Sequence, residues 1–391
     1  MIPYSRQSIC EDDINAVTEV LRSDFLTQGP KIEEFEKGLA EYFGADHAIC
    51  CSSGTAALHL AYAGMGADQQ SIAIVPAVTF SATANAFKYL GSEILFCDII
   101  PDTGILCLNH LEELLSTINP SEFSKVFIVA VSFAGTIPPL TRLKEISEKY
   151  QCMLIEDASH SFGASHVEST TGEITKSGDC NCFNAVCLSF HPVKHLCCGE
   201  GGAILTNSQD LAEKTKRLRS HGIHRPNPPD SEIPWFYEQI ELGWNYRMTD
   251  IQAALGLNQL KKVDQMITKR REIARLYDEV FGNKEFEERF KRPNYDPNSS
   301  WHLYIIRFHE KGERDRAHKF LKQRGILTQV HYIPLYKHPY FAGLLGDIKL
   351  DGAEKYYKGC LSIPIFPELS SDDQEKIILE LKNFLNIEDT I

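Results

Sequence analysis

Short apolar runs alternate with amphipathic stretches along the first 250 residues. Stretches such as Ile32–Tyr42 and Ala56–Gly64 repeat their apolar residues with a helical period. Between such stretches lie short apolar runs of a length typical of strands; these runs are His47–Cys51, Ile72–Val75, Ile94–Cys97, Val126–Ser132, Met153–Ile155 and Val186–Phe190. Strands that alternate with helices predict an α/β domain around a mostly parallel sheet, with helices on both faces.

The pattern changes near residue 245. Thr249-Asp-Ile-Gln252 is a capping-box sequence, and the apolar residues behind it keep a helical period as far as Val280. This predicts one long helix that joins two domains, a large one over residues 1–248 and a smaller α+β one that completes residues 249–391. The segments predicted beyond this helix are strands at Trp301–Phe308 and Leu327–His331, a loop at Ile333–Phe341 and a final helix near Asp372–Leu385. Proline content also predicts a loop at Pro226–Asp230.

The composition is that of a soluble globular chain of two or three domains, at about 150 residues per domain. Of its 391 residues 43% are hydrophobic and 24% are charged, and 53 acidic against 40 basic residues give a net charge of −13. An acidic chain repels phosphate backbones, so we expect no nucleic-acid partner. No apolar run approaches the roughly 20 residues of a membrane span, and the first residues lack the layout of a signal peptide. We therefore expect a cytoplasmic protein without membrane contact. Its twelve cysteines are then expected to be reduced thiols, without the spacing of a metal site.

Four polar motifs follow predicted strands or precede the long helix, and open α/β sheets bind ligands at the carboxyl ends of their strands. They are Ser52-Ser-Gly-Thr-Ala56, Glu156-Asp157, Ser189-Phe-His-Pro-Val-Lys194 and Gly243-Trp-Asn-Tyr-Arg-Met-Thr-Asp250. Each has an ordinary structural interpretation. The first would be a turn with a helix cap and the second a helix N-cap. The third would be a solvated surface lysine, and the fourth a loop whose polar residues bind no ligand.

Each motif also has a chemical interpretation. Gly54 and the helix start behind it offer free N–H groups to a phosphate. A carboxylate at Asp157 would pair with a cationic ring nitrogen, and a desolvated Lys194 would be a usable amine nucleophile. Ser189 would bind the phosphate, and Phe80, whose alternative is core packing, would stack on a flat ring. Together these groups predict a site for pyridoxal phosphate, whose protonated ring acts as an electron sink.

The chain resembles the DegT/StrS-type sugar aminotransferases, which have the fold of aspartate aminotransferase, the fold type I of pyridoxal phosphate enzymes. The resemblance runs nearly end to end. The motifs that support it are Asp24-Phe-Leu-Thr-Gln-Gly-Pro30, Ser53-Gly-Thr-Ala-Ala-Leu-His59, Glu156-Asp-Ala-Ser-His160, Ser189-Phe-His-Pro-Val-Lys-His195, Gly199-Glu-Gly-Gly202, Arg219-Ser-His-Gly222, Tyr246-Arg-Met-Thr-Asp-Ile-Gln-Ala-Ala254 and Val330-His-Tyr-Ile-Pro334.

The resemblance implies a role for each site residue. Lys194 would bond covalently to the cofactor and then move protons, Asp157 would pair with the pyridine nitrogen, and His160 would lie near the ring hydroxyl. Gly54, Thr55 and Ser189 would hold the phosphate, and Asn245 would reach the phosphate of the neighbouring subunit's site, which implies a homodimer with shared sites. The residues expected to contact a nucleotide sugar are Tyr4, Phe25, Leu26, Thr27, Asn245, Gln329, His331 and Tyr332.

Several stretches are most similar to one branch of this family, which transfers an amino group from L-glutamate to C4 of a UDP-linked 4-keto-6-deoxy-N-acetyl hexose. They are Ile2–Ser5, Ser23–Pro30, Phe190–His195 and Gln329–Pro334. One alternative is the same chemistry on the keto sugar that leads to perosamine or 4-amino-arabinose. Another is a non-catalytic relative that binds the cofactor, which the presence of Lys194 and Asp157 disfavours. A nicotinamide-dependent dehydrogenase is disfavoured because no Gly-x-Gly-x-x-Gly follows the first strand.

Two cysteine pairs depart from the family's usual pattern. Cys197-Cys198 stands where relatives usually have hydroxyl residues, and Cys50-Cys51 replaces small or polar residues before the phosphate turn. Both pairs conserve side-chain volume. We expect them to weaken a hydrogen bond at most and to remove no catalytic group.

Overall fold

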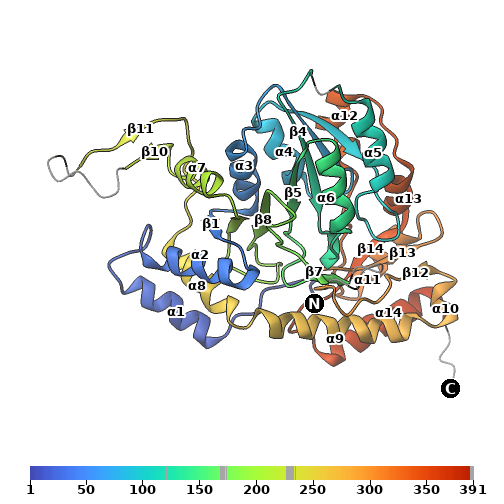
Figure 1. The fold of residues 1–391 in the computed structure, drawn as a ribbon. Helices are drawn as coiled ribbons and strands as arrows, with labels where there is room; N and C mark the ends of the chain where they lie inside the picture. The colour runs from blue at the N-terminus through green and yellow to red at the C-terminus, as the bar shows by residue number, and fades with distance from the viewer. Residues whose placement is uncertain (120, 168–171, 173, 226–232, 234, 388–391) are drawn as a thin grey trace.

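A seven-stranded sheet forms the centre of the larger part of the molecule (Figure 1). The computed structural model describes residues 1–119, 121–167, 172, 174–225, 233 and 235–387, so the loop predicted at Pro226–Asp230 lies outside the described residues. In the order β1-β9-β8-β5-β4-β2-β3, the strands are His47–Cys51, Gly202–Thr206, Ala185–Ser189, Met153–Asp157, Lys125–Val131, Ser71–Pro76 and Glu93–Cys97. All run parallel except β9, which is antiparallel to β8 and to β1. The prediction of a mostly parallel sheet is confirmed.

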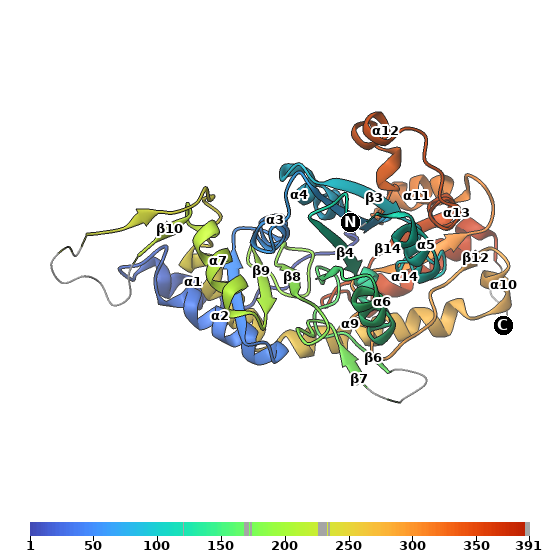
Figure 2. The same ribbon diagram turned by 45° about the horizontal axis from the view of Figure 1, so that its top comes forward.

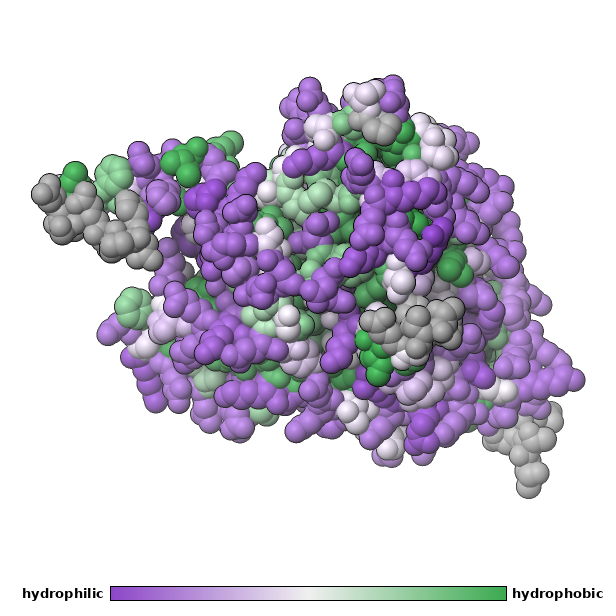
Figure 3. All heavy atoms as spheres, viewed as in Figure 1, coloured by the Kyte–Doolittle hydropathy of each residue, from purple (hydrophilic) through white to green (hydrophobic). Residues whose placement is uncertain are grey.

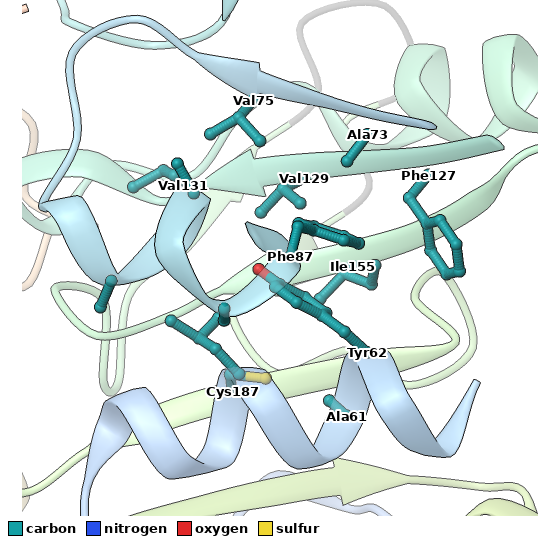
Figure 4. Close-up of a cluster of buried hydrophobic side chains, with 14 of the residues drawn as sticks. Ala61, Tyr62, Ala73, Val75, Phe87, Phe127, Val129, Val131, Ile155 and Cys187 are labelled. Carbon is teal, nitrogen blue, oxygen red and sulfur yellow. The ribbon is translucent and has the colours of Figure 1, made fainter. Parts of the chain in front are cut away.

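Helices cover both faces of this sheet (Figure 2). On one face lie α3 (Gly54–Gly64), α4 (Ser81–Tyr89) and α7 (Gln209–Arg219), and on the other α2 (Pro30–Phe43), α5 (Leu108–Thr117) and α6 (Leu140–Lys149). Successive strand residues point to opposite faces, so Val75 enters the first core and Ile74 the second. Figure 4 shows the first core, in which Tyr62 of α3 and Phe87 of α4 stack with ring centroids 3.7 Å apart.

The predicted single linking helix is wrong, because the structure has two helices, α8 (Asp250–Leu260) and α9 (Val263–Phe281). The break falls at Lys262, which has non-helical angles of φ −123° and ψ 5°. Its ammonium lies 2.6 Å from Oδ2 of the buried Asp13 in α1 (Glu11–Leu21). Asp13 also accepts hydrogen bonds from Asn258 and Gln259, so one buried carboxylate of α1 holds the end of α8. The capping box at Thr249 is present.

A three-stranded antiparallel sheet forms the C-terminal part, from β12 (Phe290–Lys291), β13 (Tyr304–Phe308) and β14 (Cys360–Ile363). The strand predicted at Leu327–His331 is wrong. Leu327 hydrogen-bonds to Ile2 and only Gln329 bridges to Ser362, so the segment divides its backbone between two partners and forms no ladder. The helices of this part are α10 (Lys284–Glu287), α11 (Glu313–Gln323), α12 (Pro339–Leu345), α13 (Asp351–Gly359) and α14 (Ser371–Leu385).

Two of these helices bear on the predictions. α14 confirms the predicted final helix. α12 begins inside the segment predicted as a loop, because Pro339 occupies the first helical turn, where a missing N–H costs no hydrogen bond. Figure 2 shows α12 standing out from the body.

The first residues of the chain are fixed between the two parts. Ile2 donates a hydrogen bond to the carbonyl of Gly325 and accepts one from Leu327, and Ile365 N donates to the carbonyl of Tyr4. The N-terminal segment therefore brings Tyr4 beside residues 329–333.

Two small hairpins complete the fold. β6 (Ser165–Val167) pairs with β7 (Ile174–Lys176), and β10 (Ile223–His224) pairs with β11 (Glu238–Gln239). The β10–β11 arm, of which residues 223–225, 233 and 235–242 are described, projects away from the body in Figure 1. Figure 3 shows hydrophobic residues along this arm. No helix among the described residues has the length and apolarity to cross a membrane.

Candidate active site

A cavity of about 820 Å³ opens at the carboxyl edge of the central sheet. It lies where β1, β5 and β8 end, and residues 329–333 and the N-terminal segment close its other side. The structure brings eleven of the predicted site residues to this one cavity: Tyr4, Gly54, Thr55, Phe80, Asp157, His160, Ser189, Lys194, Gln329, His331 and Tyr332.

Four predicted site residues lie outside this cavity. The ring of Phe25 is 55% exposed beside Leu26, which is also exposed. Thr27 forms an isolated bridge with Thr249, and Asn245 forms one with Ser220. The chain on its own therefore does not unite these residues with Lys194.

Asp157 is held at the end of β5 by hydroxyl groups. Thr83 Oγ1 donates to Oδ2 over 2.8 Å, and Ser159 Oγ donates to Oδ1 over 2.6 Å. Asp157 is only 5% exposed, and these two hydrogen bonds fix the orientation of its carboxyl group. Sequence reasoning missed Thr83. The sequence feature that could have identified it is the spacing of four residues between Thr79 and Thr83 at the start of α4. In the structure their hydroxyl oxygens lie 2.9 Å apart.

Lys194 follows β8 and turns its amine into the cavity. The side chain is partly exposed to that space, yet dense protein surrounds it, and this desolvation lowers the pKa of Lys194 to about 8. The negative charge of Asp157 opposes the shift and the positive charge of Arg270 adds to it. About a tenth of the amine is therefore uncharged at pH 7, far more than in an ordinary lysine, and this uncharged form can act as a nucleophile or a proton acceptor.

The start of α3 forms one end of the cavity. Ser53 is the N-cap, and its hydroxyl accepts from Ala56 N over 3.1 Å. A Cβ on Gly54 would lie 2.8 Å from Ser189 Cβ, and one on Gly202 would lie 2.4 Å from the carbonyl oxygen of Ser53. These glycines let three segments meet around the free N–H groups of the first helical turn, an arrangement that suits an anionic phosphate.

His160 and Phe80 both line the cavity, and each lies close to Tyr332. His160 Nε2 lies 3.2 Å from Tyr332 Oη, while its Nδ1 is buried without a partner, and burial lowers the pKa of His160 well below its usual value. Phe80 is 59% exposed, with its ring centroid 6.1 Å from that of Tyr332. The cavity thus has an uncovered aromatic face and a neutral imidazole.

Pyridoxal phosphate fits this set of groups. The glycine-lined start of α3 with Ser189 would hold its phosphate, Asp157 would meet a cationic ring nitrogen, and the open face of Phe80 would cover a flat ring. Lys194 supplies an amine of lowered pKa within the same cavity.

Known proteins similar to this chain are sugar aminotransferases. Residues 7–382 match the model of the DegT/DnrJ/EryC1/StrS aminotransferase family. A Campylobacter jejuni protein, UDP-4-amino-4,6-dideoxy-N-acetyl-β-L-altrosamine transaminase, is 40% identical over 95% of this chain and 94% of its own length.

Solved structures agree with the sequence relatives. One of them is Helicobacter pylori PseC, an aminotransferase involved in the biosynthesis of pseudoaminic acid. It is 32% identical to this chain, the match covers 98% of this chain and 99% of PseC, and the TM-score is 0.87. The pyridoxal phosphate form of the putative sugar aminotransferase Spr1654 from Streptococcus pneumoniae is 26% identical over 98% of each chain, with a TM-score of 0.87.

Proposed function

The chain belongs to the DegT/DnrJ/EryC1/StrS aminotransferase family and uses pyridoxal phosphate, and from this premise we propose its substrates and its assembly. It moves the amino group of L-glutamate to C4 of a UDP-linked 4-keto-6-deoxy-N-acetyl hexose. The product is UDP-4-amino-4,6-dideoxy-N-acetyl-β-L-altrosamine, an intermediate of pseudaminic acid synthesis. The observation that carries this proposal is the 40% identity, over 95% of the chain, to a transaminase named for that product.

The side chains divide the work of transamination. When bound, pyridoxal phosphate supplies a protonated ring that withdraws electrons from the carbon at which the amino group is exchanged. The Asp157 carboxylate, which Thr83 and Ser159 orient, would hold the proton on the ring nitrogen. Lys194 Nζ would take the proton from the donor's α-carbon and would deliver it to the cofactor carbon that keeps the amino group. Because glutamate and keto sugar use one cavity in turn, we expect ping-pong kinetics.

We further propose that the enzyme works as a homodimer whose subunits complete each other's sites. Asn245 and the segment from Phe25 to Thr27 lie outside this chain's own cavity. The β10–β11 arm beside Asn245 exposes Trp235 by 74% and Leu242 by 80%, and large apolar side chains on an arm are covered by a partner. All twelve cysteines are free thiols, which suits a cytoplasmic enzyme.

Trapping the cofactor tests the site. Purified protein should be yellow, and borohydride should fix the cofactor on the peptide that contains Lys194. Lys194→Ala should abolish turnover and trapping, while Lys261→Ala, an exposed lysine outside the cavity, should leave both unchanged. Turnover by Lys194→Ala would refute the role of this residue.

A substrate panel tests the specificity. UDP-, dTDP- and GDP-linked 4-keto sugars are compared with glutamate as donor. We expect the UDP-linked N-acetyl sugar to give the highest kcat/KM. A clear preference for a dTDP or GDP sugar would favour the perosamine or 4-amino-arabinose alternative.

Mixing two inactive variants tests the shared sites. Lys194→Ala and Asn245→Ala each damage every site of their own homodimer. In a mixed dimer one site combines Lys194 of one subunit with Asn245 of the other, so random mixing should restore about a quarter of the activity. No recovery, after subunit exchange has been verified by mass, would contradict shared sites.

A further inference from the structure

Arg270 is a buried cation that has no carboxylate partner among the described residues. It lies in the middle of α9 and is 1% exposed, the largest fully buried side chain among the described residues. Its Nη1 donates to the carbonyl oxygens of Ile365, His302 and Trp301 at 2.9, 3.3 and 3.4 Å, and its Nε has no acceptor. Buried charges are normally paired, because an isolated ion loses its hydration. Hydrogen bonds to carbonyl dipoles hold this guanidinium but do not cancel its charge.

The charge of Arg270 faces a row of buried imidazoles that ends beside Lys194. The ring of His302 lies 5.4 Å from that of His195 and 4.2 Å from that of His160. All three rings are buried, and each has an Nδ1 without a partner. His195 is the residue after Lys194, so the row connects α9 with the lysine.

One segment, residues 299–302, fixes this row in place. The carbonyl of Ser300 accepts from His195 Nε2 over 3.0 Å, and the Ser300 hydroxyl donates to the carbonyl of His160 over 3.3 Å. Trp301 has a left-handed φ of +48°, and Arg270 holds the carbonyls of Trp301 and His302. The guanidinium therefore acts on the site in two ways: it holds this segment by hydrogen bonds, and its positive charge acts electrostatically on the imidazoles and on Lys194.

We propose that Arg270 is a positioning residue for transamination, and that its uncompensated charge favours the uncharged forms of the Lys194 amine and of the His195 and His302 imidazoles. This inference rests on the cofactor role proposed above for Lys194. An uncharged lysine can bond to the cofactor and accept a proton, and neutral imidazoles add no competing charge next to the ring.

The directions of the pKa shifts agree with this proposal. Burial is the larger cause, and the charge of Arg270 further lowers the pKa of Lys194, His195 and His302. Asp157 opposes it at Lys194. The other titratable or charged groups that face the row or line the cavity are Tyr4, His191, Glu200, Arg271, His331, Tyr332 and His338.

Labelling of the cofactor-free protein measures the Lys194 amine directly. Acetic anhydride is applied across pH 6 to 11, and the modified peptide is quantified by mass spectrometry. Without the cation, the labelling midpoint of Lys194 should rise by about one pH unit in Arg270→Met and in Arg270→Gln, which keeps a donor for the carbonyls. Arg270→Lys, which keeps the charge, should stay nearer the wild type. An unchanged midpoint in a folded neutral variant would overturn the proposal.

Arg271→Met is the matched control. Arg271 is the next residue of α9 and also donates to backbone carbonyls, those of Ser299, Asn298 and Gly163. Its loss should reduce stability without moving the Lys194 midpoint. An equal shift in Arg271→Met would show a general loosening and would overturn the specific role of Arg270.

The wild-type protein supplies a measurement that leaves Arg270 in place. With labelled histidine, NMR should show the imidazoles of His195 and His302 unprotonated down to pH 5, as it should those of other buried residues such as His59 and His331. Single His→Gln replacements assign the signals. Titration of His195 or His302 near pH 6.5 would overturn the proposal. Borohydride trapping on Lys194 separates the two inferences, because absence of trapping in the wild type would refute the proposed function instead.

Discussion

Asp157 and Lys194 share one cavity but are controlled by different means. Two hydroxyl donors orient the Asp157 carboxylate, whereas desolvation and the Arg270 cation favour the uncharged Lys194 amine. An oriented acid for the ring nitrogen and an amine that loses its proton readily are therefore combined in one cavity. The sequence predicted both residues from their places after strands, but not Thr83 or Arg270, whose importance depends on contacts between distant elements.

Asp157→Asn should remove the charge while keeping the shape of the side chain. The ring nitrogen would lose its proton more readily, and we expect kcat/KM to fall by about a hundredfold or more. Thr83→Val, which removes one hydroxyl and leaves the carboxylate, should cost about tenfold. Steady-state kinetics with the keto sugar check both. An Asp157→Asn enzyme as active as the wild type would contradict the role of the carboxylate.

The lowered pKa of Lys194 predicts how cofactor loading depends on pH. A lysine is uncharged above its pKa, so bonding to added pyridoxal phosphate should speed up with rising pH and level off above about 8. Between pH 7 and pH 9 the uncharged fraction rises about tenfold, and the rate should follow. Stopped-flow absorbance of the cofactor-free protein measures it, with Lys194→Ala as the blank. A rate that still climbed steeply up to pH 10 would indicate an ordinary lysine.

At the scale of elements, helices and strands were predicted well where neighbouring residues determine their ends. The strands β1 and β3 were predicted within a residue, because turn-forming residues bound short apolar runs there. β9 was missed because its apolar residues follow the glycines of residues 199–202. The break between α8 and α9 depends on Asp13, which no window around Lys262 contains. Gln329 forms only a bridge, because its neighbours pair with the N-terminus.

Gly202→Ala should disturb the cofactor site through the start of α3. The added methyl group would lie 2.4 Å from the carbonyl oxygen of Ser53 and 2.8 Å from Gly54 N, and backbone atoms cannot move aside by changing rotamer. We expect the Kd for pyridoxal phosphate to rise at least tenfold, or about 1.4 kcal/mol. Absorbance titration of the cofactor-free protein measures it. Gly343→Ala, where nothing lies within 4 Å, should not change this Kd.

At the scale of the whole molecule, the site is assembled from distant parts of the chain. The division at residue 248 remains a prediction, but the cavity takes Asp157 and Lys194 from before it and Gln329 to Tyr332 from after it. Resemblance to a family predicted these residues one by one. Their convergence depends on long-range packing, whereas Asn245 and Phe25 lie outside the cavity of the single chain.

Asp98 should matter to the stability of the whole molecule. It follows β3 and accepts hydrogen bonds from Gly352 N and Ala353 N, both over 2.8 Å, so it caps α13 from across the structure. Asp98→Ala should lower the free energy of unfolding by about 1–2 kcal/mol. Urea unfolding of the holoenzyme measures it. The half-exposed Asp102, paired with Arg307 and Lys291, is the control, and Asp102→Ala should cost less because solvent screens such pairs. An equal loss in both variants would contradict the cap.

The pairing of Ile2 with Gly325 and Leu327 has a consequence for biosynthesis. A ribosome releases the amino end of a chain first, so the opening residues emerge long before the residues that will receive them. Tyr4 cannot take its place until Ile365 has also been translated. The wall of the catalytic chamber that Tyr4 forms is therefore completed at the end of synthesis, and a nascent chain stalled short of that point would lack it.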